Sequence, residues 1–192
     1  AGNPVKTAAI IHEDGPFGSS MADLIEKTLP DQGITVVERI PHPTPHRDFN
    51  NIALRVKASR ADIIIPSNYL NEYTLMTRAL QQQRVELMAI YSVLGGAASN
   101  IRFVRENNDV AQYVIDCNHW YDPKKEASQA LAASVAAAGL DMTYDIMVAY
   151  ATIQVVADAL ERGASDDRLK MIEALAASDY ADSIMPYGPT RF

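Results

Sequence analysis

The feature that most constrains the fold is an alternation of short apolar runs with amphipathic stretches over the first 117 residues. The apolar runs have the length of strands, end at Pro, Gly or polar clusters, and span residues 5–11, 34–40, 61–65, 86–91 and 110–117. The segments between them carry apolar residues at helical spacing, at 21–29, 49–57, 72–83 and 97–106. This pattern predicts a doubly wound α/β fold with a mostly parallel, five-stranded sheet covered on both faces.

The alternation stops near Trp120, where a helical segment begins. Residues 124–138, 144–162 and 166–177 all have the spacing of helices, with an N-cap expected at 165–166, and we expect no further strand among them. Residues 146–160 are apolar on most faces and need burial on more than one side. The sequence therefore predicts an α/β unit at 1–121, followed at 122–192 by helices without a sheet of their own to cover.

Charge and composition exclude several partners. The net charge of -7 opposes binding to nucleic acid or to an anionic membrane surface, so we expect no nucleic-acid partner. No apolar run approaches the roughly 20 residues of a membrane helix, and the first residues lack the pattern of a signal peptide. The single cysteine, Cys117, excludes an internal disulfide. We expect its thiol to be buried.

Motifs of nucleotide binding and catalysis are missing from the sequence. The segment Gly-Pro-Phe-Gly-Ser-Ser at 15–20 matches neither a phosphate loop nor a dinucleotide fingerprint, and no Gly-x-Ser-x-Gly motif occurs. Cys117 and His119 would point to opposite faces of a strand. The other histidines, His12, His42 and His46, have no metal-ligand spacing, and we expect all four to be solvated loop residues. We therefore expect no catalytic residue, metal or cofactor.

The carboxyl ends of the predicted strands are where an open parallel sheet binds its ligands. The loops there combine aromatic, small and amide residues, a composition suited to a small organic molecule; they are 12–18, 41–44, 66–69, 92–96 and 118–121. Phe17 and Tyr69 each follow a strand and either cap the core or stack on a ligand. Trp120 either packs in a buried interdomain position or contacts a ligand. At 18–20, backbone N–H groups could bind an anion, or Ser19 and Ser20 could simply cap a helix.

Five ordered blocks carry a family resemblance over nearly the whole chain. They are KTAAIIHEDGPFGSSM, ITVVERIPHPTPHRDFNNIALRVKASRADIIIPSNYLNEYTLMTRALQQQ, VIDCNHWYDP, YATIQVVADALERGASDDRLKMIEAL and MPYGPTRF. The most specific parts are the Asp-x-x-Phe-Gly and Ala-Leu-Glu-Arg-Gly motifs. The sequence resembles the substrate-binding proteins of branched-chain amino-acid ABC transporters, which are type I periplasmic binding proteins.

The resemblance implies an architecture and a role. Family members enclose a ligand between two α/β lobes; residues 1–121 look like the second lobe, and 122–192 look like helices that return to the first lobe, most of which is absent from this chain. It implies a non-enzymatic, periplasmic solute receptor whose partners are a small-molecule ligand and an ABC permease of the membrane, with a signal peptide not present in this chain. The alternative is a sensory or regulatory ligand-binding domain on the same scaffold.

The resemblance also implies ligand-binding positions. Phe17, followed by Gly18, stands where the family often has a tyrosine that covers the ligand. Asn68 and Tyr69 match the loop of the third strand, where the family has an aromatic residue.

The fourth strand departs from the family. Its loop places Val93 and Leu94 where amino-acid-binding members have an acidic residue for the ligand's ammonium group. A buried ammonium without a carboxylate is costly. The ligand is therefore expected to be an aromatic or aliphatic carboxylate, or a branched-chain amino acid if Asp145 supplies the charge. The residues themselves favour the alternative that Asp145 is a helix N-terminal acid stabilised by the helix dipole.

Trp120 lies on the crossover between the two parts and completes the expected ligand contacts. The uncovered apolar faces of 144–160 and 169–175 favour a homodimer, because large exposed apolar patches are rare on monomers.

Overall fold

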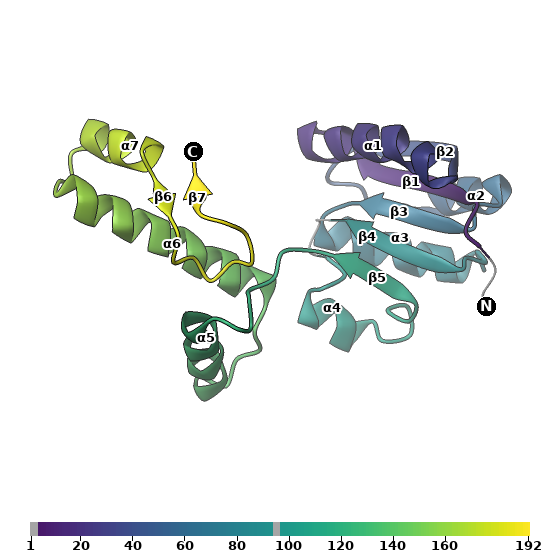
Figure 1. Cartoon of the computed structure of the whole chain (residues 1–192). Coiled ribbons are helices and arrows are strands. Elements are labelled where there is room, and N and C mark those ends of the chain that lie inside the picture. Colours follow the sequence, from purple (N-terminus) through teal and green to yellow (C-terminus); the bar gives the residue numbers. More distant parts are fainter. Residues whose placement is uncertain (1–3, 94–96) are drawn as a thin grey trace. The chain divides into compact units, whose positions relative to one another are not determined.

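A computed structural model of the chain describes residues 4–93 and 97–192 (Figure 1). It divides into two compact units, Ala1–Asn118 and His119–Phe192. Among the described residues, no helix is long and apolar enough to cross a membrane.

The first unit is a five-stranded parallel sheet with helices on both faces. Its elements, in chain order, are β1 (Thr7–Glu13), α1 (Pro16–Thr28), η1 (Leu29–Gln32), β2 (Thr35–His42), α2 (Asn50–Ser59), β3 (Ile63–Ser67), α3 (Leu70–Gln82), β4 (Ala89–Val93), α4 (Ile101–Glu106) and β5 (Val114–Cys117). The strand order is β2-β1-β3-β4-β5, and every neighbouring pair is parallel. The expected doubly wound α/β fold is confirmed.

The two central strands explain the continuous apolar runs in the sequence. Ile10 and Ile11 of β1 face opposite sides of the sheet, and both are completely buried. On one face, Ala22 and Ile25 of α1 pack against Ile10 and its neighbours. On the other face, α2, α3 and α4 cover Ile11 in a larger cluster that includes Phe103. A strand covered on both faces needs apolar residues at consecutive positions, which is the pattern observed.

The start of α1 differs from the expectation that Ser19 or Ser20 caps it. The helix begins at Pro16 with Gly15 as its N-cap, so both serines lie inside the helix. Proline favours the first helical position because its fixed φ matches the helix and its missing N–H needs no partner there.

Strand β2 also differs from its predicted end at residue 40. It continues through Pro41 to His42, where it pairs with the end of β1. Proline is tolerated because β2 is an edge strand of the sheet, and only one side of an edge strand is hydrogen-bonded.

The second unit contains three helices and a short strand pair. They are α5 (Glu126–Ala137), α6 (Tyr144–Gly163), α7 (Arg168–Ala176), β6 (Asp179–Tyr180) and β7 (Thr190–Arg191). The expectation of no further strand is wrong, because β6 and β7 pair antiparallel. The cap of α7 is Asp167 rather than 165–166, and its carboxylate accepts hydrogen bonds from the N–H groups of Leu169 and Lys170.

The core of the second unit is small. It consists of Met147 and Ala151 on α6 and Ile184 and Met185 in the segment between β6 and β7, with partly buried neighbours around them. Several large apolar side chains of α6 and α7 are exposed: Tyr150, Ile153, Leu160, Leu169 and Ile172.

Candidate ligand-binding site

The carboxyl ends of β1 and β3 form a topological switch point. These strands are neighbours in the sheet, yet α1 leaves β1 toward one face and α3 leaves β3 toward the other. Diverging connections open a crevice at the carboxyl edge of an α/β sheet, and ligands bind there. Phe17, in the first turn of α1, and Tyr69, the N-cap residue of α3, lie at this point.

The two aromatic rings at the switch point contact each other. Their centroids are 5.7 Å apart and their planes are inclined by 33°. Phe17 is half-buried, and Tyr69 is 47% exposed. An aromatic pair in this geometry presents an apolar surface with a phenol hydroxyl at one end.

The N–H of Gly18 stabilises the loop between β1 and α1 and does not form an open anion site. This N–H donates to a Glu13 carboxylate oxygen over 2.5 Å, and the N–H of Gly15 donates to the other oxygen over 2.6 Å. A Cβ at position 18 would lie 2.3 Å from the Glu13 carbonyl oxygen, so only glycine fits. Sequence reasoning missed Glu13; an acidic residue shortly before a proline at a helix start was the available signal.

Asn68 is turned into the protein and is only 1% exposed. Its side-chain N–H₂ donates to Nε2 of His42 over 2.7 Å, and the N–H at Nδ1 of His42 donates to the Pro43 carbonyl over 2.9 Å. Burial lowers the pKa of His42, in keeping with this neutral tautomer. Asn68 therefore ties the loop that carries Tyr69 to the end of β2.

The histidines of β1 and β2 correct the expectation of solvated loop residues. His12 and His42 lie on strands and are buried. His12 donates from Nδ1 to the Glu13 carbonyl over 2.8 Å and accepts at Nε2 from Nε of Arg39 over 3.2 Å. Among the described residues, no cluster of three or more His, Cys, Asp and Glu could hold a metal ion.

The ends of β4 and β5 complete this edge of the first unit. Val93 is half-buried at the end of β4, and Leu94 lies outside the described residues. Cys117, opposite Val93 in the parallel register, ends β5. The expectation of a buried thiol is wrong, because Cys117 is exposed.

Trp120 and Asp145 belong to the second unit. Trp120 is 43% exposed, and its ring lies 5.2 Å from that of Tyr121. Asp145 is exposed in the first turn of α6. Next to Trp120, Nδ1 of His119 is hydrogen-bonded to the Tyr187 hydroxyl, with the rings edge to face.

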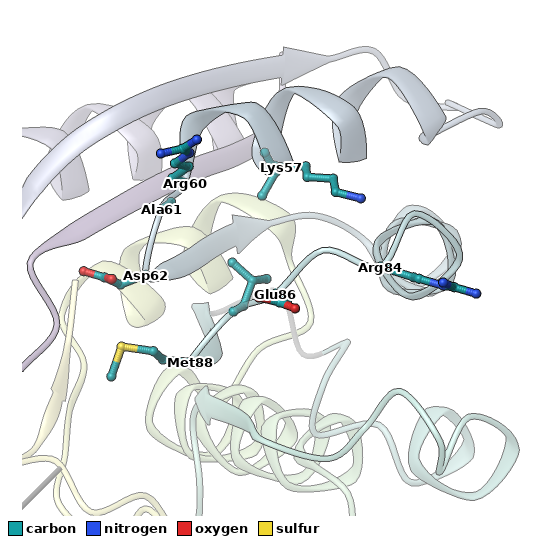
Figure 2. Close-up of a pocket in the computed structure, with 9 residues that line it drawn as sticks. Lys57, Arg60, Ala61, Asp62, Arg84, Glu86 and Met88 are labelled. Carbon is teal, nitrogen blue, oxygen red and sulfur yellow. The ribbon is translucent and has the colours of Figure 1, made fainter. Parts of the chain in front are cut away.

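A cavity of about 790 Å³ lies at the opposite, amino-terminal edge of the sheet, beside the starts of β3 and β4. Figure 2 shows its charged side chains pointing apart, with Lys57 and Arg84 on one side and Arg60 and Asp62 on the other. Lys57 donates to the Gln83 carbonyl, and Asp62 accepts from the N–H groups of residues 6 and 7. The charges are mixed, divergent and partly engaged by the backbone, so this cavity lacks the convergent polar groups of a binding site.

Known proteins resemble this chain in sequence and in fold. The sequence model of the periplasmic binding protein family matches residues 1–192. The Leu/Ile/Val-binding protein BraC3 of Rhizobium johnstonii is 28% identical over 172 residues, covering 88% of this chain and 46% of that protein. Leu/Ile/Val-binding protein homolog 3 of Brucella melitensis is 26% identical with the same coverage. The family and these relatives are binding proteins, not enzymes.

Solved structures share the fold. A leucine-binding protein from Thermotoga maritima superposes with a TM-score of 0.82 at 15% identity, covering 98% of this chain and 53% of that one. A fatty acid ABC transporter substrate-binding protein from Thermomonospora curvata gives a TM-score of 0.76 at 14% identity, covering 98% and 49%. The chain thus spans about half the length of the proteins it matches.

Proposed function

Because the chain belongs to the periplasmic binding protein family, we propose that it is part of a non-catalytic receptor that binds a small molecule outside the cytoplasm and delivers it to an ABC permease. Residues 1–121 would form the second lobe, and 122–192 the helices that return to the first. The observation that carries the proposal is the contact between Phe17 and Tyr69 at the switch point. Enclosure between two lobes supplies affinity from such apolar contacts and a few polar anchors.

We propose an apolar carboxylate as the ligand, either an aromatic or aliphatic acid or a branched-chain amino acid. Phe17, Tyr69 and the half-buried Val93 offer an apolar surface. The names of the matched proteins include leucine and fatty acid as ligands, and both are carboxylates with an apolar chain. Gly18 and Asn68 support the surface through backbone and side-chain hydrogen bonds. The ligand contacts of Trp120 and, for an amino acid, Asp145 stay predictions from the sequence.

The test is a titration of the chain with L-leucine, L-valine, phenylacetate and octanoate at millimolar concentrations, followed by the NMR signals of the aromatic rings. We expect an apolar acid to shift the ring signals of Phe17 and Tyr69. Tyr69→Ala should weaken that acid's binding about tenfold, a loss of about 1.4 kcal/mol. Tyr113→Ala is the matched control, since Tyr113 is exposed at the start of β5. Binding that Tyr69→Ala leaves unchanged would refute the site.

We further propose that a second copy of the chain covers the exposed apolar side chains of α6 and α7, which include Ile153 and Leu169. The two helices pack against each other, and large exposed apolar patches are rare on monomers, which favours an interaction face here. Light scattering over a concentration series should show dimers that Leu169→Lys weakens. A monomer at every concentration would contradict this pairing and leave the ligand site untouched.

A further inference from the structure

Glu13 is a buried carboxylate whose two oxygens are both used inside its own loop. The residue is 5% exposed. One oxygen accepts from the N–H of Gly15 and the other from that of Gly18, at 2.6 and 2.5 Å. Hydrogen bonds to a charged acceptor are short and about twice as strong as neutral ones. This acceptor comes from two residues before the N-cap, whereas an ordinary cap comes from the N-cap side chain itself.

These two bonds enclose the segment that carries Phe17. Gly15 and Gly18 lie on either side of Pro16 and Phe17, so one carboxylate fixes both ends of this short segment. The backbone of Glu13 is fixed in turn, because its carbonyl accepts from Nδ1 of His12. The backbone position of Phe17, and with it the ring contact to Tyr69, therefore depends on one side chain that touches neither ring.

The same carboxylate occupies the N-terminus of α1. A helix N-terminus attracts anions through its free N–H groups and the helix dipole. Here Pro16 has no N–H, the N–H of Gly18 points to Glu13, and the N–H of Ser19 bonds to the Gly15 carbonyl over 3.0 Å. A negative charge of the protein already sits where a ligand carboxylate would otherwise bind.

We infer that Glu13 is the positioning residue for the Phe17–Tyr69 pair, and that it restricts this helix end to apolar contacts by excluding the ligand's carboxylate from it. The inference rests on the proposed function, which makes the ring pair a ligand surface. It assigns the recognition of the ligand's anionic group to residues outside the first turn of α1.

The experiment compares Glu13→Ala and Glu13→Gln with wild type in the 192-residue chain, using nuclear Overhauser effects (NOEs) between the rings of Phe17 and Tyr69. This readout needs no ligand, so its failure is separable from failure of the proposed function. We expect the ring–ring NOE to be lost in Glu13→Ala and restored by sodium formate, whose carboxylate can occupy the space of the missing one. Sodium chloride at equal ionic strength should restore nothing. Glu86→Ala, at an exposed position on the opposite edge of the sheet, should keep the NOE without formate.

The second variant keeps the inference testable if Glu13→Ala does not fold. Glutamine offers one acceptor oxygen and places an N–H₂ group against the other backbone N–H, so Glu13→Gln should weaken the ring–ring NOE at least twofold. With phenylacetate as probe, Glu13→Gln should bind about tenfold more weakly, whereas formate should restore phenylacetate binding to Glu13→Ala. A ring–ring NOE that persists at wild-type strength in either variant without formate overturns the inference, even if phenylacetate binds normally.

Discussion

The two units of the chain bury their apolar side chains in different ways. The first has a sheet whose central strands are buried on both faces, so its core is continuous from α1 through the sheet to α2, α3 and α4. The second has a small core around Met147 and Ile184 and leaves much of the apolar surface of α6 and α7 exposed. Helices that have no large sheet to cover fold locally but leave part of their apolar surface exposed. Four predictions test this difference.

The largest effect is expected from a core substitution in the first unit. Ile64 of β3 is completely buried, so Ile64→Ala should cost about 2–5 kcal/mol through lost burial and a residual cavity. Leu140→Ala, at a position 60% exposed between α5 and α6, should change stability by less than about 0.5 kcal/mol. Hydrogen exchange of amides in β1, β3 and α6 measures both units in one experiment. Equal losses of protection in the two variants would contradict the difference in burial between the two units.

Two glycines give the next largest contrast. Gly18→Ala places a Cβ 2.3 Å from the Glu13 carbonyl oxygen and 2.8 Å from its nitrogen, so backbone must shift, at a cost of about 1–3 kcal/mol. In the second unit, a Cβ at Gly188 meets nothing within 4 Å, so Gly188→Ala should be near neutral. Urea unfolding, monitored by circular dichroism, gives the free energy of unfolding of both variants. A neutral Gly18→Ala would show that the β1–α1 loop is not tightly constrained.

A smaller effect is expected from acid on the buried polar groups of the first unit. Burial lowers the pKa of His42 below its ordinary value of 6.5, so the unfolded chain binds a proton first as the pH falls. This contribution to stability is present above pH 6.5 and is lost as the pH falls from 6.5 through the folded-state pKa. His42→Gln keeps an acceptor for Asn68 and should flatten the pH dependence between pH 7.5 and 5. If stability depends on pH in the same way in wild type and in His42→Gln, His42 is not the cause of that dependence.

The smallest effect is expected at the strand pair of the second unit. Arg191 donates two hydrogen bonds to the carboxylate of Asp179, and these hold the pKa of Asp179 below its ordinary value. Both groups are exposed, so Arg191→Gln should raise the pKa of Asp179 toward 3.8 with little change in melting temperature. NMR titration of the Asp179 carboxyl and a thermal melt provide the two readouts. A large drop in melting temperature would mean that this pair anchors the second unit.

The order of the five main strands along the chain and the helical nature of the second unit could be predicted from the sequence. The buried runs of β1 and β3 were visible because both of their faces are covered, which leaves no polar position. The end of β2 was missed because Pro41 signals a stop unless the strand is known to be an edge. Strands β6 and β7 are two residues each, too short to produce a periodic signal.

The candidate site was harder to predict from the sequence than the fold. Phe17 and Tyr69 could be named from their places after strands, but their contact depends on the strand order, which sets β1 beside β3. Asn68 is predicted to contact a ligand, yet its side chain bonds to His42 of β2, on the far side of β1. The role of Glu13 depends on two backbone N–H groups, and an acidic residue before a helix-start proline does not by itself show which N–H groups it binds. The periodicity of a sequence does not encode which distant segments of the chain come into contact.

The exposed thiol at the end of β5 has a practical use. Cys117 is the only cysteine in the sequence, and it lies one strand away from Val93 at the carboxyl edge of the sheet. A maleimide dye would therefore attach at one defined place in the unaltered chain, without substitutions to remove competing thiols. Its emission would report solvent exclusion at this edge, so the chain already contains the attachment point for a fluorescent reporter of the proposed ligand site.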